Sequence, residues 1–379
     1  MPETPNGPEG VAAPGAAPAR RHAVFHRLQV AAVEPVLDDA VAITFDVPAE
    51  LREEFRFTQG QHLTLRTTID GAEIRRNYSI CAPVSGGRLR IAVKRLDGGV
   101  FSTWATSALK AGDEVEVMTP TGRFHVVLDP TASRHHVFIA AGSGITPVMS
   151  LLTTTLEVER TSRCTLVYGN RTTASVMFLE ELQDLKNEHP ERFQLINVLS
   201  REPQDVELFT GRIDEAKLRQ LLATLIPAAS VDEWFLCGPF AMVETARATL
   251  LAAGVDVSHV HLELFHVDGE PIRAARAATA AAGVGPTRSA VTIVLDGRAT
   301  TFDLAPYAES ILDAALKARG DAPYACKGGV CGTCRARVIE GAVEMDRNYA
   351  LETDEIAAGV VLACQSHPTT PTVTLDFDQ

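Results

Sequence analysis

The spacing of apolar positions changes along the chain, and the first pattern covers Phe25 to about Val127. Here short runs rich in β-forming residues, at 62–67, 89–94 and 114–118, are separated by Gly and Pro. Strand-length runs that are broken repeatedly by turn residues are typical of all-β domains. The pattern predicts an antiparallel β-barrel or sandwich.

After His135 the pattern becomes one of short, wholly apolar segments that alternate with helical stretches. The apolar segments are Val137–Ala141, Cys164–Tyr168 and Trp234–Cys237, and the helical stretches cover 147–160 and 176–188. A strand that is apolar on both faces is buried on both faces, as happens when helices cover both sides of a parallel sheet. We therefore expect an α/β domain with a doubly wound parallel sheet.

A third pattern begins near residue 289. Two strands, Ala290–Leu295 and Thr300–Leu304, flank the turn residues Asp296-Gly297, and a helix is predicted from about Ser310. Asp-Gly between two apolar runs is a strong hairpin signal. The last segment therefore predicts a small α+β module.

Two segments lack the apolar residues that a folded core needs. Residues 1–22 are rich in Pro, Ala and Gly, which favours a disordered tail. The Ala-rich segment 269–288 ends in Gly and Pro and is interpreted as a linker. The predicted domains are therefore 23–129, 130–268 and 289–379.

Composition supports a folded, multidomain protein. A chain of 379 residues is long for one core, and 46% apolar and 22% charged residues is an ordinary globular balance. The net charge of −13 argues against nucleic acid as a partner. The N-terminus lacks the features of a signal peptide, and no apolar stretch is long enough to cross a membrane, so we expect a cytoplasmic protein without a membrane partner.

The cysteines carry the most specific signal in the sequence. Cys326, Cys331 and Cys334 are separated by four and then two residues, and Cys364 follows. This is the ligand spacing of plant-type [2Fe–2S] clusters. Structural zinc sites usually show two short C-x₂-C pairs, which this loop lacks. The four cysteines are therefore predicted to ligate a [2Fe–2S] cluster.

The glycines of the cysteine loop fit this interpretation. Four thiolates must converge on two irons, and Gly328, Gly329 and Gly332 permit the tight turns that such a loop requires. A cluster of this kind carries one electron at a time. By itself it would make the protein an electron carrier.

A four-residue run in the first domain resembles a known flavin motif. Arg76-Asn77-Tyr78-Ser79 is similar to the R-x-Y-[ST] motif of the ferredoxin–NADP reductase superfamily. The resemblance implies that Arg76 pairs with the flavin pyrophosphate, that Tyr78 packs on the flavin, and that Ser79 approaches its N5 atom. A guanidinium fork suits phosphate oxygens, and a phenol offers an apolar face with a polar tip.

Two further elements resemble the same superfamily. The run from Gly99 to Ser102 is similar to its G-x-x-S element, where a helix N-terminus receives the pyrophosphate. Glu263-Leu264-Phe265 resembles its E-x-[FY] element, which implies that Phe265 covers the flavin and that Glu263 assists proton or hydride handling. The resemblance implies FAD rather than FMN.

The second domain contains a predicted nicotinamide site. The strand Val137–Ala141 runs into a turn with Gly142, Gly144 and Thr146, and a helix is expected from Val148. A strand, a glycine turn and a helix N-terminus together form an anion site. Further along, Cys237-Gly238-Pro239 resembles the C-G-P element that the superfamily holds beside the nicotinamide, so Ser79, Cys237 and Glu263 are the candidate catalytic residues.

Polar residues at two other strand ends bear on the choice of coenzyme. Arg171, Ser200 and Arg201 follow predicted strands, at the edge where open α/β sheets bind ligands. Ser-Arg at this point resembles the 2′-phosphate site of NADP-linked members, because phosphate prefers a guanidinium and a hydroxyl. Since no acidic residue takes the ribose-diol role, NADPH is expected, with NADH possible.

The order of the three domains resembles the reductase components of multicomponent oxygenases. Within that group, the runs 78–83, 118–124 and 343–351 are most similar to the reductases of phenylacetyl-CoA epoxidases, which are di-iron oxygenases. Nicotinamide gives two electrons together and the cluster accepts one, so the resemblance implies a flavin between them. We expect a path from NADPH through FAD and [2Fe–2S] to an oxygenase.

Three alternatives stay open on the sequence. The chain could serve another aromatic or di-iron oxygenase, because fold and cofactors do not specify the acceptor. It could instead be a non-catalytic redox sensor, or a flavin or ferric reductase whose cluster is vestigial.

Overall fold

The computed structural model describes residues 24–265, 288–305 and 308–378. The predicted tail at 1–22 and all of the predicted linker except Arg288 lie outside these residues. The exact domain boundaries stay predictions, and the three units are named here by their sheets.

The barrel domain is built on six antiparallel strands in the order β4-β3-β6-β1-β2-β5. A single bridge between Ile80 and Ile91 joins the two edges and closes the sheet. Helix α1 packs Phe101 and Ala105 into the apolar interior. The elements are β1 Phe25–Leu37, β2 Ala40–Asp46, β3 His62–Ile69, β4 Ala72–Ser79, β5 Leu89–Lys94, α1 Val100–Ser107 and β6 Glu114–Met118. The expected antiparallel barrel is confirmed.

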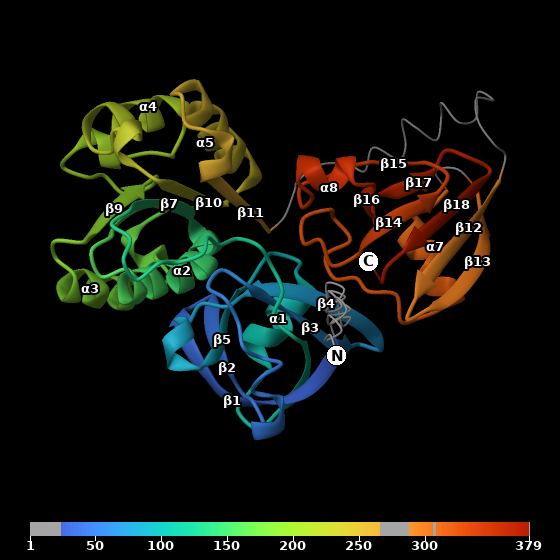
Figure 1. Ribbon diagram of the computed structural model, residues 1–379. Coiled ribbons are helices and arrows are strands. Elements are labelled where there is room, and N and C mark those ends of the chain that lie inside the picture. Colours follow the sequence, from blue (N-terminus) through green and yellow to red (C-terminus); the bar gives the residue numbers. More distant parts are fainter. Residues whose placement is uncertain (1–23, 266–287, 306–307, 379) are drawn as a thin grey trace, which may run out of the picture.

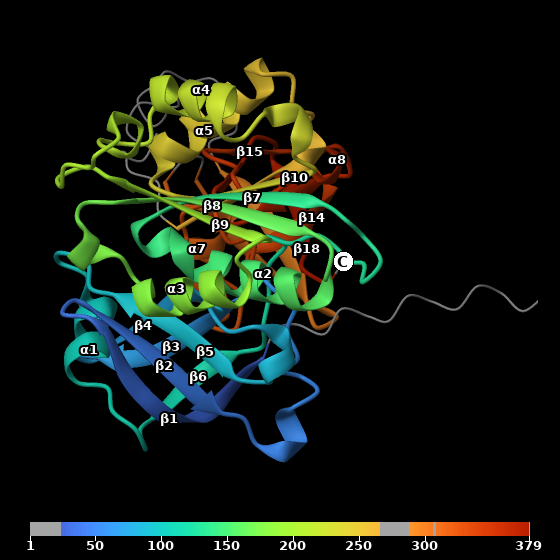
Figure 2. The same ribbon diagram turned by 90° about the vertical axis from the view of Figure 1, so that its left-hand side faces the viewer.

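The parallel-sheet domain has five strands in the order β11-β10-β7-β8-β9, all parallel. Its strands are β7 His135–Ala141, β8 Arg163–Asn170, β9 Phe193–Leu199, β10 Glu233–Gly238 and β11 Val260–Leu264. Its helices are α2 Ile145–Val158, α3 Leu179–Glu188, α4 Glu215–Thr224 and α5 Phe240–Ala252. Figure 2 shows α2 and α3 on one face of the sheet and α4 and α5 on the other.

Alternation along β7 explains why the sequence here is wholly apolar. Phe138 and Ala140 pack into the cluster that contains residues of α2 and α3. Val137 and Ile139 pack into the cluster that contains residues of α4 and α5. Because successive side chains of a strand point to opposite faces, a sheet covered on both faces needs apolar residues at every position. The predicted doubly wound sheet is confirmed.

The start of helix α2 differs from the sequence-based expectation. The helix was expected from Val148, but it begins at Ile145, directly after a 3₁₀ turn over Gly142–Gly144. Pro147 therefore lies in the first helical turn. Proline is tolerated there because the N–H groups of the first turn have no partner within the helix.

The C-terminal module contains a mixed sheet in the order β13-β12-β18-β14-β16 and a small β15-β17 ribbon. Asp296 and Gly297 both have positive φ, 52° and 67°, as a tight two-residue hairpin turn requires. Its elements are β12 Ser289–Leu295, β13 Arg298–Leu304, α7 Ile311–Ala318, β14 Arg335–Glu340, β15 Val343–Met345, α8 Thr353–Ala357, β16 Val360–Leu362, β17 Ser366–Pro368 and β18 Thr372–Asp376. The predicted α+β module is confirmed.

The three units touch one another, and the C-terminal module lies beside β3 and β4 of the barrel (Figure 1). Arg90 of the barrel forms a two-pronged salt bridge with Glu181 of α3. Glu355 of α8 accepts a hydrogen bond from Arg123 of the barrel at 2.8 Å. The ring of Phe240, at the start of α5, lies 5.4 Å from the ring of Tyr349 in the C-terminal module.

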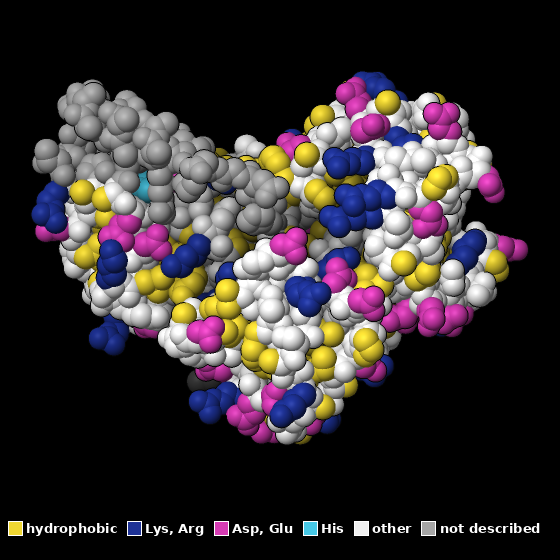
Figure 3. Space-filling view, turned by 180° about the vertical axis from the view of Figure 1, so that it is seen from behind, with side chains coloured by type: hydrophobic (Ala, Val, Ile, Leu, Met, Phe, Trp, Pro, Cys, Tyr) yellow, Lys and Arg dark blue, Asp and Glu magenta, His cyan; other side chains and the backbone are white. Residues whose placement is uncertain are grey.

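The surface is mixed in charge on the face seen in Figure 3, where basic and acidic side chains lie side by side. Within the described ranges, none of the helices has the length and apolar character needed to cross a bilayer.

Candidate functional site

The carboxyl ends of the parallel strands bring several of the predicted residues into one row. Cys237 of β10 lies in register with Glu263 of β11 on one side and Ala140 of β7 on the other. Cys237 is fully buried, and burial, with a contribution from Glu263, raises the pKa of its thiol. The thiol is therefore neutral at pH 7.

The glycine turn packs directly against Cys237. A Cβ atom at Gly144 would lie 2.2 Å from the carbonyl oxygen of Cys237, so no other residue fits without moving the backbone. Gly142 has a φ of +54°, and its carbonyl accepts a hydrogen bond from Tyr168 Oη at 2.9 Å. Thr146 is buried, and its hydroxyl donates to the Ser143 carbonyl at 3.1 Å. The turn is thus held rigidly against the end of β10.

A hydrogen bond joins the predicted flavin motif to the end of the parallel sheet. The hydroxyl of Ser79 donates to Glu263 Oε2 at 3.0 Å, across 184 residues of sequence. The Glu263 side chain is 14% exposed. Burial raises the pKa of its carboxyl to about 8, although the Ser79 hydrogen bond opposes the change. Glu263 is therefore mostly protonated at pH 7.

The other oxygen of Glu263 faces a residue that the sequence analysis missed. His62 Nδ1, on β3, lies 3.9 Å from Glu263 Oε1, and its Nε2 lies 3.3 Å from the Thr121 hydroxyl. Burial lowers the pKa of the His62 ring. Both groups therefore favour their neutral forms at pH 7, and the contact is not an ion pair. No local sequence signal marks His62, because its partner comes from another domain.

The rest of the predicted flavin motif lies along β4. Arg76 is exposed, and its Nη1 donates to the Arg75 carbonyl at 2.7 Å. The ring of Tyr78 lies 5.5 Å from that of Phe101, the second residue of α1. Arg76 and Tyr78 are two residues apart, so they lie on the same side of the strand. A flat group bound beside Tyr78 would have a cation within reach.

The N-terminus of α1 provides an anion-binding position close to this strand. Gly99 is the N-cap, and a Cβ there would lie 2.5 Å from Ser102 Oγ. Ser102 is buried, and its hydroxyl accepts from the Leu96 N–H and donates to the Gly99 carbonyl, both at 3.1 Å. Its side chain therefore braces the turn, and the backbone N–H groups of α1 are left to meet a ligand.

Phe265 ends the described part of this domain. It follows β11 directly, and 39% of its surface is exposed. An aromatic side chain with this much exposed surface next to Glu263 is available to cover a bound ring.

The predicted coenzyme residues of β8 and β9 meet at the same edge. The Ser200 and Arg201 N–H groups donate to the Asn170 and Arg171 carbonyls, at 2.9 and 2.8 Å. Both arginines are exposed. No hydrogen bond or ion pair ties either guanidinium to another residue in the described part of the chain. The pair is thus available for an anionic ligand.

The four predicted cluster ligands lie close enough to affect one another. Cys331, burial and Cys364 raise the pKa of the Cys326 thiol, and Cys364, burial and Cys331 raise that of the Cys334 thiol. Within the described ranges, no three His, Cys, Asp or Glu side chains converge to hold one metal ion. Four cysteine sulfurs that influence one another in this way fit a cluster with four thiolate ligands. The four cysteines and their spacing fit [2Fe–2S], whereas structural zinc sites usually show two short C-x₂-C pairs.

Hydrogen-bond donors point at three of the four sulfurs. The Gly328 N–H and the Thr333 hydroxyl point at the Cys326 and Cys331 sulfurs, at 3.3 and 3.2 Å. Such donors stabilise thiolates and tune cluster potential. Gly329 and Gly332 have φ values of +79° and +67°, so they supply the left-handed turns that were expected, whereas Gly328 does not need positive φ.

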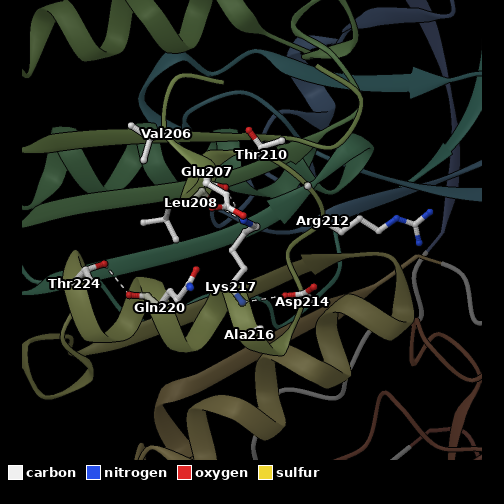
Figure 4. Close-up of a pocket in the computed structure, with 11 residues that line it drawn as sticks. Val206, Glu207, Leu208, Thr210, Arg212, Asp214, Ala216, Lys217, Gln220 and Thr224 are labelled. Carbon is white, nitrogen blue, oxygen red and sulfur yellow. Dashed lines mark hydrogen bonds between the residues drawn. The ribbon is translucent and has the colours of Figure 1, made fainter. Parts of the chain in front are cut away.

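Two open pockets lie away from these residues. The pocket in Figure 4, of about 550 Å³, is lined by Glu207, Arg212, Lys217 and neighbours beside α4. A second pocket, of about 650 Å³, lies between the barrel and α2 and includes Val126 and Thr154. Neither is lined by a predicted site residue. The predicted residues lie instead along the sheet edge and the contacts between domains.

Comparison with protein families matches all three units. Residues 27–126 match the oxidoreductase FAD-binding domain, residues 138–248 the oxidoreductase NAD-binding domain, and residues 293–369 the 2Fe-2S iron-sulfur cluster binding domain. The predicted cofactors FAD, NAD(P)H and [2Fe–2S] are thereby confirmed at the level of the domains.

Full-length relatives share the same organisation. The chain is 46% identical, over 93% of its length and 98% of the relative, to one component of the 1,2-phenylacetyl-CoA epoxidase of Escherichia coli. It is 33% identical, over 92% of its length and 96% of the relative, to the ferredoxin reductase component of 3-ketosteroid-9-alpha-monooxygenase from Rhodococcus rhodochrous.

Solved structures support the fold. Phthalate dioxygenase reductase is 24% identical over 93% of this chain and 98% of its own, with a TM-score of 0.58. A type IV self-sufficient cytochrome P450 monooxygenase is 22% identical over 93% of this chain and 41% of its own, with a TM-score of 0.67.

Proposed function

The chain belongs to the family of flavin and iron–sulfur reductase components of oxygenases, and on that premise we propose that its partner is a phenylacetyl-CoA epoxidase. As a member of this family, it passes electrons from NAD(P)H through FAD and [2Fe–2S] to an oxygenase.

The choice of partner rests on sequence identity to two relatives. Identity to the epoxidase component is 46% over almost the whole of both chains, against 33% to the ketosteroid monooxygenase component. The three domains themselves do not decide the partner, because reductases of different oxygenases share them. The margin in identity between two relatives of nearly equal coverage therefore supports an epoxidase of phenylacetyl-CoA over another oxygenase.

The flavin would be held by β4 and α1. We assign Arg76 and the N–H groups of α1, shaped by Gly99 and Ser102, to the pyrophosphate, because a guanidinium and a helix N-terminus both favour phosphate. Tyr78 and Phe265 would pack against the ring system. When bound, FAD takes two electrons from the nicotinamide and releases them one at a time.

Ser79, Glu263 and Cys237 are assigned to the place where flavin and nicotinamide meet. Ser79 would hold its hydroxyl near the flavin N5, and Glu263, neutral at pH 7, would exchange a proton with that hydroxyl. The buried, neutral Cys237 would contact the nicotinamide without reacting with it, since only a thiolate is strongly nucleophilic. Gly142, Gly144, Thr146 and Gly238 would shape the backbone around the coenzyme.

We propose NADPH as the physiological donor. Arg171 and Arg201, with the Ser200 hydroxyl, provide the guanidinium and hydroxyl groups that a 2′-phosphate needs. The adjacent acidic residue, Glu202, already accepts hydrogen bonds from the N–H and hydroxyl of Thr173 at 2.7 and 2.6 Å. It is therefore not available to bind a ribose diol as NADH-selective sites do.

Cys326, Cys331, Cys334 and Cys364 would ligate the cluster. A complete ligand set disfavours the vestigial-cluster alternative, and reductase relatives over the whole chain disfavour the sensor alternative. The cytoplasm is the proposed location, because NADPH is supplied there and thiolates stay reduced.

Reconstitution tests the proposed partner. The flavin- and cluster-loaded chain is mixed with the oxygenase subunits of a phenylacetyl-CoA epoxidase, NADPH and phenylacetyl-CoA, and epoxide formation is measured. The matched reaction uses a ketosteroid oxygenase and its steroid. We expect turnover only with the epoxidase. Faster turnover with the steroid oxygenase would overturn the assignment.

A further inference from the structure

Strand β4 has a second role besides carrying the flavin motif. Arg76 and Tyr78 lie on one side of the strand, while Glu73 and Arg75 lie on the other, because side chains alternate. Both Glu73 and Arg75 contact Tyr324 of the C-terminal module. The strand therefore joins the predicted flavin site to a segment two residues from the cluster ligand Cys326.

The side chain of Arg75 is buried in this contact, with only 6% of its surface exposed. Its guanidinium carbon lies 4.0 Å from the centre of the Tyr324 ring and 5.2 Å from that of Phe25. Its Nε donates to Glu73 at 2.9 Å, and its Nη1 donates to the Tyr324 carbonyl at 3.5 Å. Removing the partners of a buried charge destabilises a protein strongly, because the charge is then left without compensation.

Tyr324 contacts residues of both the barrel and the C-terminal module. Its hydroxyl donates to Glu73 Oε1 at 3.4 Å, and the ammonium of Lys327 lies 4.7 Å from its ring centre. Tyr324 and Lys327 flank Cys326 in the sequence. Contacts that fix Tyr324 therefore fix the start of the cysteine loop.

We propose that Arg75 is a positioning residue for the electron transfer between flavin and cluster. By stacking on Tyr324, it holds the Cys326 segment against the strand that carries Arg76, Tyr78 and Ser79. It acts on the separation and orientation of the two redox sites and not on the chemistry of either. The inference rests on the reductase function and is independent of which oxygenase is the partner.

Other contacts reach different parts of the module, since Arg123 binds Glu355 on α8 and Phe240 contacts Tyr349. Val330 of the cysteine loop packs against the apolar cluster of the parallel-sheet domain, so that contact does not hold the loop to β4. A desolvated cation–π contact changes an equilibrium by roughly thirtyfold. Removing Arg75 should weaken the contact between the Cys326 segment and β4 by about this factor.

The test compares Arg75→Leu with a neighbouring control, Arg66→Leu, in the full-length protein loaded with FAD and cluster. Arg66 lies opposite Arg75 on β3, and its guanidinium carbon is 4.1 Å from the Phe25 ring centre. Its hydrogen bonds go to Glu116 within the barrel, and it reaches the Tyr324 contact only through Glu73, whose Oε2 lies 3.9 Å from Arg66 Nη1. It therefore resembles Arg75 in position and charge without bonding to the C-terminal module.

Anaerobic stopped-flow mixing with NADPH separates the two steps. In Arg75→Leu, flavin bleaching should keep its rate, while cluster reduction should slow by roughly tenfold or more. Ferricyanide reduction should persist, and reduction of an acceptor that needs the cluster should fall. Arg66→Leu should behave like the wild type, and Arg75→Lys should recover part of the rate because it keeps the cation.

Two readouts do not depend on turnover. Hydrogen exchange of residues 324–335 should quicken in Arg75→Leu and not in Arg66→Leu, while the EPR signal and midpoint potential of the cluster should stay unchanged. An unchanged rate of cluster reduction in Arg75→Leu overturns the proposal. Loss of the cluster or a shifted potential overturns it too, because Arg75 would then act on the cluster itself.

Discussion

Replacing Glu263 by Gln should stabilise the protein at neutral pH. Burial raises the pKa of the Glu263 carboxyl from its usual value of 4.5 to about 8 in the folded protein. The unfolded chain therefore releases this proton at a lower pH than the folded chain does. Stability contributed by this group is complete below pH 4.5 and is lost as the pH rises towards 8.

The expected loss of stability follows from the interval between the usual pKa of 4.5 and pH 7. Each pH unit between the two pKa values corresponds to about 1.4 kcal/mol, so the loss is about 3 kcal/mol at pH 7. Gln has the same shape as the neutral acid, accepts from the Ser79 hydroxyl and does not ionise. The variant should therefore unfold roughly 6–12 °C higher than the wild type at pH 7, if the parallel-sheet domain unfolds as a unit.

The assay is calorimetric unfolding of the flavin-loaded protein from pH 5 to pH 9, with Glu233→Gln as the matched control. The Glu233 side chain is 13% exposed, and burial raises the pKa of its carboxyl, but the hydrogen bond from His261 and the neighbouring His259 outweigh burial and lower that pKa. Glu233→Gln should therefore destabilise the protein at pH 7. Parallel curves of melting temperature against pH for the wild type and Glu263→Gln would refute the reasoning, because they would show that Glu263 ionises normally.

Three further predictions concern the cluster, the coenzyme and the glycine turn. Cys331→Ser should abolish electron transfer to the oxygenase and leave ferricyanide reduction intact in the same preparation. A normal rate of electron transfer to the oxygenase would mean that the cluster does not lie on the path from FAD to the oxygenase. Arg201→Ala should raise the KM for NADPH by about 10–100-fold, since a charge-assisted hydrogen bond contributes about 1.5–3 kcal/mol. The KM for NADH should stay nearly unchanged. Equal effects on both coenzymes in steady-state assays would argue against a 2′-phosphate contact. Gly144→Ala should lower the free energy of unfolding by about 1–3 kcal/mol, because the added Cβ would lie 2.2 Å from the Cys237 carbonyl oxygen. An unchanged melting temperature would contradict this close contact.

Local patterns in the sequence were sufficient for most of the fold. Two barrel strands, Leu89–Lys94 and Glu114–Met118, have the predicted bounds. The alternation of wholly apolar strands and helices predicted the parallel sheet, because burial on both faces leaves a continuous apolar run. The spacing of Cys326, Cys331 and Cys334 predicted the cluster, because ligands on one short loop must converge locally. Each of these signals lies within a few residues of chain.

Only the tertiary structure decided how the domains meet. The Ser79–Glu263 hydrogen bond spans 184 residues, and the Arg75–Tyr324 contact spans 249. His62 gives no signal in the sequence, since its proximity to Glu263 depends on how the barrel docks against the parallel sheet. The raised pKa of Glu263 has the same origin, because burial between domains is not encoded in any local pattern. The sequence determined the sites that each domain builds alone, and docking of the domains determined the contacts that connect them, because periodicity and spacing report only on neighbours along the chain.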